Sequence, residues 1–140
     1  MQANRVCIAG YDENGQCIRP VLPHVGISEQ SLTAKGKPIV FPFAVVEYDF
    51  LGHKPEPPHT EDWRYDPASV HFVRRADEAQ RQNTLDKSLS PDVAAIFEQP
   101  IQHDLGYYVI DGQGPRSLGT IQPRSINKAF HEQREGKWDY

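Results

Sequence analysis

Short apolar runs separated by Gly, Pro and polar turns dominate the hydrophobic pattern of this chain. Residues 39–51 (IVFPFAVVEYDFL) alternate in a way that is typical of a long strand, and Pro42 indicates a bulge or an edge position near its start. Residues 70–74 (VHFVR) indicate a further short strand. The pattern therefore predicts a mainly β protein with minor helices.

A β-hairpin is predicted at residues 7–21, CIAGYDENGQCIRPV. Asn14-Gly15 favours a two-residue type I′ turn, because both residue types tolerate positive φ angles. Such a turn pairs residues whose numbers add up to 29, so that Tyr11 faces Ile18. The other pairs on that side are apolar too, and we expect this face of the hairpin to point to the core.

The register of this hairpin also bears on the two cysteines. Cys17 would lie opposite Asp12, about 16 Å along the strands from the partner of Cys7, and a disulfide cannot span that distance. The sequence has no CxxC motif that would indicate a zinc site. We therefore expect two reduced cysteines with small buried side chains.

Arg19 is the first candidate for a functional role. In the predicted register it faces Gly10, which has no side chain, and lies diagonally from Asp12. A glycine inside a strand often marks a close approach to the backbone, so Arg19 can offer its guanidinium group to a phosphate, a carboxylate or a base. The alternative is a structural ion pair with Asp12 or another carboxylate.

The remaining predicted elements are shorter. One helical turn is predicted after Ser28, in the polar connection that follows the hairpin. Residues 76–90 are polar and indicate either a surface helix or a loop. A clearer helix begins with Ser90 as its N-cap, followed by a proline at the first helical position. Residues 106–110 and 116–122 predict a second hairpin.

This inventory of short strands and two minor helices predicts a small OB-like β-barrel. We expect residues 1–140 to form a single compact unit, with two packed sub-barrels, 1–75 and an abbreviated 76–140, as the alternative. Trp138 and Tyr140 indicate the start of a further strand. The chain end at Tyr140 is therefore either a natural edge or a truncation.

Composition narrows the classes of partner. The 15 Lys and Arg residues are outnumbered by 19 Asp and Glu residues, which gives a net charge of −4. A protein that holds duplex DNA through phosphate contacts usually has a basic surplus, so any nucleic-acid binding here must use a local groove and stacking. No apolar run approaches the roughly 20 residues that span a bilayer, and the first residues lack the layout of a signal peptide. We expect a cytoplasmic protein without membrane contact.

The Pro-rich segment 53–67 (HKPEPPHTEDWRYDP) contains the densest group of polar side chains and is expected to be a rigid loop. Its candidate functional residues are His53, His59, Glu61, Asp62 and Trp63. The histidines and carboxylates can hold a divalent cation or act as acid and base, although their spacing matches no helical metal motif. In the alternative reading, a carboxylate pairs with an arginine such as Arg19 and the tryptophan packs under the barrel.

Other chemical signals are weaker. Exposed aromatic residues can stack on bases, and strand alternation directs one of Tyr107 and Tyr108 outward. Ser117 has no histidine near it in the sequence and the chain has no GxSxG motif, so no activated nucleophile is indicated. Residues 111–117 (DGQGPRS) are Gly-rich, as a phosphate-binding loop can be, but they fit an ordinary hairpin turn better. We expect no cofactor.

Residues 7–21 resemble the prokaryotic dual OB-fold-containing domain, whose members begin with a Cys-Ile/Val-Ala-Gly strand, then a Gly turn and a Trp-Ile/Val-Arg-Pro-Val strand. Residues 42–63 (PFAVVEYDFLGHKPEPPHTEDW) resemble the second block of that family, which ends in Glu-Asp-Trp. The resemblance covers roughly the first half of the chain. It implies that Arg19 is the family's arginine and that residues 61–63 are its Glu-Asp-Trp, whereas Cys17 stands where the family usually has tryptophan.

The leading functional hypothesis is an OB-like module that binds single-stranded nucleic acid or a nucleotide and has no catalytic activity of its own. In this hypothesis Arg19 contacts phosphate or a base edge. Trp63 and Tyr108 stack on bases, and Glu61 and Asp62 orient the arginine.

Two alternatives stay open from the sequence alone. The first is a metal-dependent hydrolase acting on nucleic acid or a nucleotide, with His59, Glu61 and Asp62 around the ion and His53 as a further candidate ligand. The second is a protein-interaction subunit that uses a strand edge or the 53–67 loop to bind a protein partner.

Overall fold

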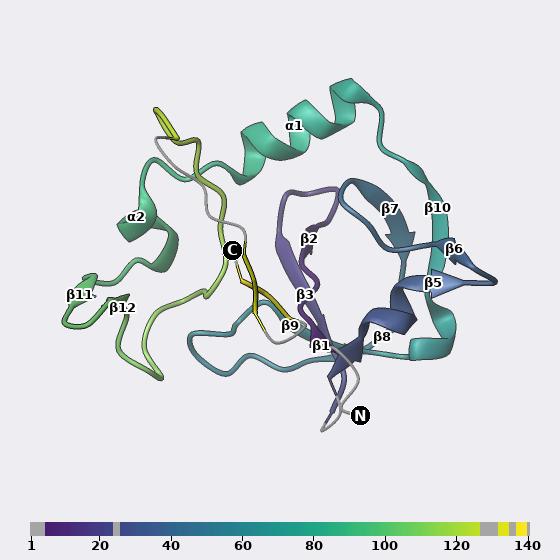
Figure 1. Ribbon diagram of the computed structural model, residues 1–140, viewed down its shortest axis with the longest axis horizontal. Helices are drawn as coiled ribbons and strands as arrows, with labels where there is room; N and C mark the ends of the chain where they lie inside the picture. Colours follow the sequence, from purple (N-terminus) through teal and green to yellow (C-terminus); the bar gives the residue numbers. More distant parts are fainter. Residues whose placement is uncertain (1–4, 24–25, 127–131, 135–136, 140) are drawn as a thin grey trace.

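The computed structural model describes residues 5–23, 26–126, 132–134 and 137–139 (Figure 1). Strands are the commonest elements in these ranges, and the two α-helices are short. The strands form several small sheets, none of which closes into a barrel within the described residues. The predicted mainly β class with minor helices is therefore confirmed, in the form of an open arrangement of sheets.

A four-stranded sheet forms the centre of the molecule. Its strands, in spatial order, are β2 (Gly10–Tyr11), β3 (Cys17–Val21), β9 (Asp62–Tyr65) and β8 (Phe50–His53). The pair β3–β9 is parallel, whereas the other two pairs are antiparallel. This parallel pair joins the two sequence blocks that carry most of the predicted site.

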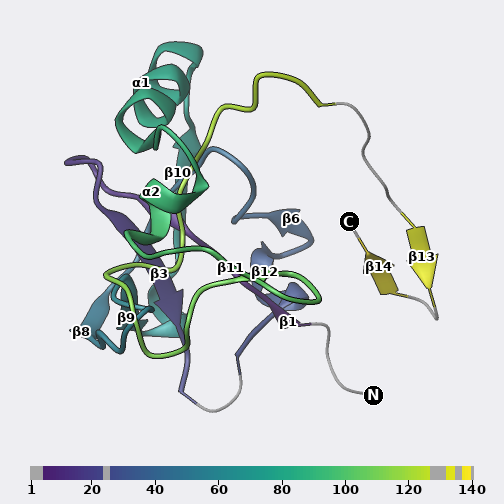
Figure 2. The ribbon, with the colours of Figure 1, turned by 90° about the vertical axis from the view of Figure 1, so that its left-hand side faces the viewer.

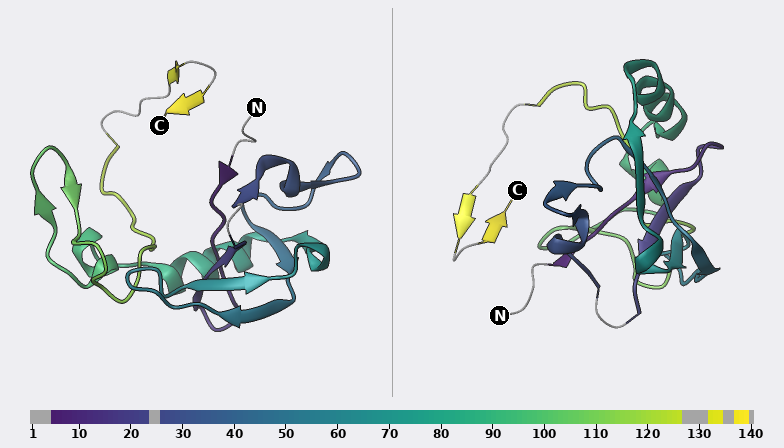
Figure 3. Two further views of the ribbon diagram at one scale, coloured as in Figure 1. Left: turned by 90° about the horizontal axis from the view of Figure 1, so that it is seen from below. Right: turned by 90° about the vertical axis from the view of Figure 1, so that its right-hand side faces the viewer.

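The described residues form five two-stranded sheets besides the central one (Figures 1 and 2). They pair β1 (Arg5–Val6) with β4 (Ile27–Ser28), β5 (Thr33–Ala34) with β6 (Lys37–Pro38), β7 (Ala44–Glu47) with β10 (His71–Arg75), β11 (Gln102–His103) with β12 (Tyr107–Tyr108), and β13 (Glu132–Arg134) with β14 (Lys137–Asp139). The helices are η1 (Glu29–Leu32), η2 (Pro67–Ser69), α1 (Glu78–Ser88) and α2 (Val93–Phe97). Figure 3 shows the β11–β12 hairpin projecting at one end of the molecule.

The turn of the first hairpin differs from the prediction. The Asp12 amide donates to the carbonyl of Gln16 (3.0 Å) and the Gly15 amide donates to the carbonyl of Asp12 (3.0 Å). Among the turn residues only Gly15 has a positive φ, of 83°. This is a three-residue loop with a glycine bulge, so the predicted type I′ turn is wrong. The Asp12 carboxylate explains the change, because it accepts the amides of Asn14 (2.9 Å) and Gln16 (2.7 Å).

The longer turn shifts the register by one residue. Gly10 pairs with Ile18 and Tyr11 with Cys17, so that partner numbers add up to 28. A shift of one residue moves side chains to the other face of the sheet. Tyr11 therefore shares a face with Cys17 rather than with Ile18, and the prediction that Arg19 faces Gly10 is wrong.

The predicted strand 39–51 is divided between two sheets. Its first part is β7 and its last part begins β8, and the chain bends between them at Asp49. There Asp49 accepts the amide of Asp66 (2.9 Å) and donates its own amide to the hydroxyl of Ser69 (2.8 Å). The predicted loop 53–67 is also wrong at its end, because it contains the central strand β9. Both differences arise from pairing between distant segments.

The predicted helices are largely present. A 3-10 turn follows Ser28, and the polar segment 76–90 forms the surface helix α1, with a capping box between Asp77 and Gln80. The predicted N-cap at Ser90 is wrong. Asp92 caps α2 instead, where its carboxylate accepts the amide of Ala95 (2.8 Å).

The second predicted hairpin is also wrong. Tyr107 and Tyr108 pair with the preceding β11 and not with residues 116–122. Trp138 lies in β14, which pairs with β13, while Tyr140 lies outside the described residues. Residues 116–122 instead run beside the helical segment, where the Ser90 amide donates to the carbonyl of Thr120 (2.7 Å).

The apolar core is small. Among the described residues, the buried apolar side chains are Ile27 (4% exposed), Tyr65 (3%), Ile96 (6%) and the proline Pro20. A cavity of about 700 Å³ lies among β3, β7 and α1, and its walls are mostly apolar. Hydrogen bonds and ion pairs between distant segments are therefore expected to carry an unusual share of the stability.

The contact between Gly119 and Ile96 gives a test of how the late segment docks. A Cβ atom at Gly119 would lie 2.7 Å from Cγ2 of Ile96, whose side chain is buried. We expect Gly119→Ala to lower the free energy of unfolding, measured by urea denaturation, by about 1–3 kcal/mol.

The matched control is Gly106→Ala, because a Cβ atom at Gly106 meets nothing within 4 Å. This variant is expected to unfold like the wild type. Equal stability changes in the two variants would show that the late segment does not pack on α2 as described.

Candidate functional site

An ion pair between Arg19 and Asp62 lies at the centre of the candidate site. The two residues are register partners in the parallel pair β3–β9. Nε and Nη2 of Arg19 donate to Oδ1 (2.5 Å) and Oδ2 (2.9 Å) of Asp62, and the two side chains are 17% and 14% exposed. The hydrogen bonds that Arg19 donates to the Asp62 carboxylate raise the pKa of Arg19. The alternative predicted for Arg19, an ion pair with a carboxylate, is thus present, with Asp62 rather than Asp12.

Glu61 is buried and is held by a different partner. Its side chain is 5% exposed, and both of its carboxylate oxygens accept the amide of Ser117 at 3.3 Å. The Ser117 hydroxyl also donates to Glu61 Oε1 and lies 2.8 Å from Nδ1 of His59. Next to this contact, the Thr60 hydroxyl donates to the carbonyl of Pro115. These bonds attach the loop before β9 to residues 115–117.

Ser117, His59 and Glu61 form a serine, histidine and acid group that the sequence did not reveal. In serine hydrolases the histidine lies between the serine and the acid, so that the acid orients the imidazole that takes the serine proton. Here the serine lies between the other two residues, and the acid bonds directly to the serine. The geometry is that of a structural clamp rather than of an activated nucleophile.

Trp63 lies on the other face of β9 from Asp62, because successive strand residues point to opposite sides. The His53 ring stacks on Trp63 with centroids 4.5 Å apart, and Phe50 contacts it at 5.7 Å. Nε2 of His53 is in turn 2.6 Å from the carbonyl of Thr60. The indole nitrogen of Trp63 is buried without a hydrogen-bond partner among the described residues.

Tyr108 is separated from the other predicted site residues. It lies on β12 and is 52% exposed, and Figures 1 and 3 show this hairpin away from β3 and β9. The structure therefore joins Arg19 to Asp62 and leaves Tyr108 on a separate surface, whereas Glu61 and Trp63, the chain neighbours of Asp62, have other partners.

The two candidate metal ligands have other partners. His53 hydrogen-bonds to a backbone carbonyl and His59 to the Ser117 hydroxyl. In the part of the chain that the structure describes, no group of three or more His, Cys, Asp or Glu residues is arranged to hold a metal ion.

Arg64 is a candidate that the sequence reasoning missed. It follows Asp62 by two residues on β9, so the two share a face, and its register partners are Val21 and Gly52. The side chain is exposed and has no ion pair within the described residues. Gly52 leaves open space beside it. The two-residue periodicity of DWRY would have indicated Arg64 if the segment had been recognised as a strand.

The cysteines are unpaired, as predicted, but they differ in environment. Cys7 is exposed, so the prediction that both are buried is wrong, and Cys17 is half-buried. Burial raises the pKa of the Cys17 thiol, and the Glu61 carboxylate raises it further, whereas a hydrogen bond with Tyr11 lowers it.

Comparison with known proteins gives one match. The family model of the dual OB-containing domain matches residues 1–140, the whole chain rather than its first half. No curated protein and no solved structure matches the chain. A search of the described residues finds no helix that is long and apolar enough to cross a membrane.

The Arg19–Asp62 pair can be tested with a double-mutant cycle. Arg19→Met or Asp62→Leu alone leaves a largely buried charge without its partner, and each is expected to lower the free energy of unfolding by about 2 kcal/mol or more. The double variant removes both charges, so we expect a coupling energy of about 1–3 kcal/mol in urea denaturation.

The control cycle uses Arg116 and Glu98, whose ion pair is also 2.5 Å long but whose side chains are 43% and 53% exposed. Solvent screens this pair, and its expected coupling energy is about 0–1 kcal/mol. If the changes in free energy of unfolding caused by Arg19→Met and Asp62→Leu simply added up in the double variant, the pair would not hold β3 and β9 together.

A second prediction concerns the Cys17 thiol in a Cys7→Ser background. Its alkylation by iodoacetamide should rise with pH along a curve displaced above that of free cysteine, because the pKa is raised. Glu61→Gln removes a negative charge that raises this pKa, so it should move the curve to lower pH. The midpoint of the curve is the readout, because it depends on the pKa of the thiol, whereas the access of iodoacetamide to the thiol changes the height of the curve. If Glu61→Gln left the midpoint unchanged, the Glu61 carboxylate would not be a cause of the raised pKa of Cys17.

Proposed function

This chain belongs to the dual OB-containing domain family, and we propose that it is a non-catalytic module that binds single-stranded nucleic acid or a nucleotide on the β3–β9–β8 face. OB folds use a sheet face and the adjoining loops to bind oligonucleotides. The net charge of −4 means that binding must depend on a few well-placed cations rather than on a basic surface.

The observation that carries the proposal is the pair of arginines on one face of the central sheet. Arg19 and Asp62 are register partners, and Arg64 lies two residues further along β9. Asp62 fixes the guanidinium group of Arg19, whereas Arg64 is exposed and has no ion pair among the described residues. Gly52 leaves room beside Arg64 for a phosphate or a ribose. Arg64 is therefore the proposed phosphate contact.

The aromatic side chains at the edge strand β8 lie on the opposite face of the sheet from Arg64, because Phe50 is the register partner of Tyr65, so a bound strand can stack on them only by passing around this edge. Phe50 is 37% exposed and also packs against Tyr48, with ring centroids 5.7 Å apart. His53 covers one face of Trp63 at 4.5 Å, so a base can stack on that face only if His53 moves aside. Tyr108 lies on a separate hairpin, so its stacking role requires a strand long enough to reach that surface.

The two alternative functions stay predictions. For the metal-dependent hydrolase, the candidate ligands His53 and His59 would have to leave their hydrogen bonds to bind an ion. For the protein-interaction subunit, β8 is an edge of the central sheet, while the 53–67 loop is partly occupied by residues 115–117. Neither alternative uses the exposed Arg64.

Fluorescence anisotropy with labelled single-stranded DNA and RNA of about twelve nucleotides tests the proposal at several salt concentrations. Arg64→Gln should weaken binding about tenfold and reduce the salt slope by about 1, because one phosphate contact is lost. The control, Arg74→Gln, removes the same charge from an exposed position in the β7–β10 sheet.

We expect Arg74→Gln to bind like the wild type. Absence of binding at low salt, or an equal effect of the two substitutions, would refute this site. Gel analysis of the oligonucleotides after incubation with Mg²⁺ or Mn²⁺ supplies a further readout, since cleavage would favour the hydrolase alternative.

A further inference from the structure

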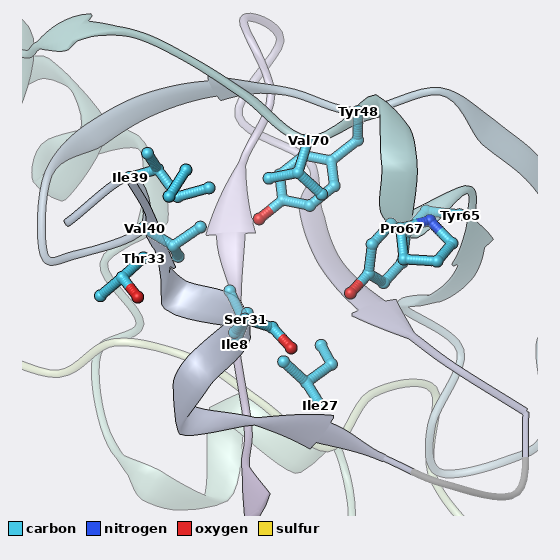
Figure 4. Close-up of a pocket in the computed structure, with 11 residues that line it drawn as sticks. Ile8, Ile27, Ser31, Thr33, Ile39, Val40, Tyr48, Tyr65, Pro67 and Val70 are labelled. Atoms are coloured by element: carbon cyan, nitrogen blue, oxygen red, sulfur yellow. The ribbon is translucent and has the colours of Figure 1, made fainter. Parts of the chain in front are cut away.

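A second cavity, of about 300 Å³, lies on the other side of β9 from Arg64 (Figure 4). Tyr65 lines it, and because Tyr65 follows Arg64 in the strand, the two side chains point to opposite faces. The larger apolar side chains of its wall are those of Ile8, Ile27, Ile39, Val40, Pro67 and Val70. The cavity is therefore separate from the arginine face described above.

Four hydroxyl groups line this otherwise apolar cavity, from Tyr48, Tyr65, Ser31 and Thr33. Figure 4 shows the phenol oxygens of both tyrosines directed into the cavity. Tyr65 as a whole is 3% exposed, and its hydroxyl, which has no hydrogen-bond partner among the described residues, is accessible from the cavity rather than fully buried. Water in the cavity can bond this hydroxyl, and a ligand with hydrogen-bond acceptors can take the place of that water.

The walls also indicate the charge of that ligand. None of the described residues that line the cavity is acidic or basic, so an ion entering it would lose its hydration without gaining a counter-charge from them. The tyrosines stay neutral donors at physiological pH, since burial raises the pKa of Tyr48 to about 12. The ligand is therefore uncharged and carries hydrogen-bond acceptors.

The size and shape of the cavity further limit the class of ligand that it can hold. A volume of 300 Å³ is that of about ten water molecules in the liquid, which suits a molecule of roughly eight to fifteen non-hydrogen atoms. The Tyr48 and Tyr65 rings meet edge to face, with centroids 5.2 Å apart and planes at 89°. An aromatic guest can therefore meet one ring face and one ring edge, which are the arrangements that aromatic groups prefer.

We propose that this cavity, the tyrosine pocket, binds an uncharged planar heterocycle of nucleobase size, whose ring acceptors take hydrogen bonds from the hydroxyls of Tyr48 and Tyr65. The same chemistry is offered by a free heterocycle and by a base carried on an oligonucleotide. The inference does not depend on the arginine face.

Saturation-transfer NMR and calorimetry with uracil, adenine and orotate test the proposal on the full chain. Uracil and orotate share a ring, but orotate carries a carboxylate at neutral pH. We expect binding of at least one neutral base, and at least tenfold weaker binding of orotate than of uracil if uracil is that base. Failure of both neutral bases to bind at millimolar concentration would overturn the proposal.

Tyr65→Phe removes the hydroxyl and keeps the ring. Because the hydroxyl lacks a partner within the described residues, this variant should melt at the wild-type temperature or above it, while binding the neutral base at least fivefold more weakly. A loss of several degrees in melting temperature would show that the hydroxyl has a structural role, and unchanged affinity would show that it does not meet the ligand. Either result would overturn the proposal.

A matched pair of substitutions tests the location. Val70 lines the pocket, whereas Val73 is 43% exposed on β10 and does not line it. Val70→Phe should fill the space and abolish binding of the base, and Val73→Phe should leave it unchanged. Equal effects of the two substitutions would place the binding elsewhere.

Competition experiments distinguish the two sources of the ligand. If a short oligonucleotide displaces the bound base, and Tyr65→Phe weakens this displacement, the pocket takes a base from a nucleic acid. If only the free heterocycle competes, the pocket takes a small molecule. Arg64→Gln should leave binding of the free base intact, so failure of the arginine face and failure of the tyrosine pocket give different results.

Discussion

The parallel pairing of β3 with β9 is the contact on which the rest of the structure depends. It joins residues more than forty positions apart in the chain, and the bidentate bond between Arg19 and Asp62 lies directly across it. Parallel strands require a long connection, and here that connection contains β4 to β8. The positions of the aromatic contacts around Trp63, of Arg64 and of the tyrosine pocket all follow from this one pairing.

The polar contacts matter because so little apolar surface is fully buried. A core reduced to a few side chains, next to cavities of about 700 and 300 Å³, supplies less hydrophobic stabilisation than a closed barrel of the same length would. The Glu61–Ser117 clamp and the Arg19–Asp62 pair compensate by tying distant segments together. Each is specific in geometry, which helps to explain how an open set of small sheets keeps one arrangement.

Sequence reasoning succeeded where a signal is local and failed where the structure depends on a distant partner. The helical turn after Ser28 and the helix at 76–90 follow from caps and propensities within a few residues. The sequence predicts β9 as part of a Pro-rich loop, because its four residues become a strand only through pairing with β3 and β8. The predicted type of the hairpin turn is wrong for a different reason, because the Asp12 carboxylate stabilises a longer loop than Asn-Gly alone would form.

The same contrast applies to the candidate site. Sequence reasoning named Arg19 and Asp62 without fixing their pairing, and it missed Arg64 and the tyrosine pocket, which depend on the alternation along β9. That strand presents Asp62 and Arg64 to one side and Trp63 and Tyr65 to the other. A charged ligand is favoured only on the first side, where cations are available, and an uncharged ring only on the second, where hydroxyls meet apolar walls. The two faces of this four-residue strand therefore favour two different classes of ligand.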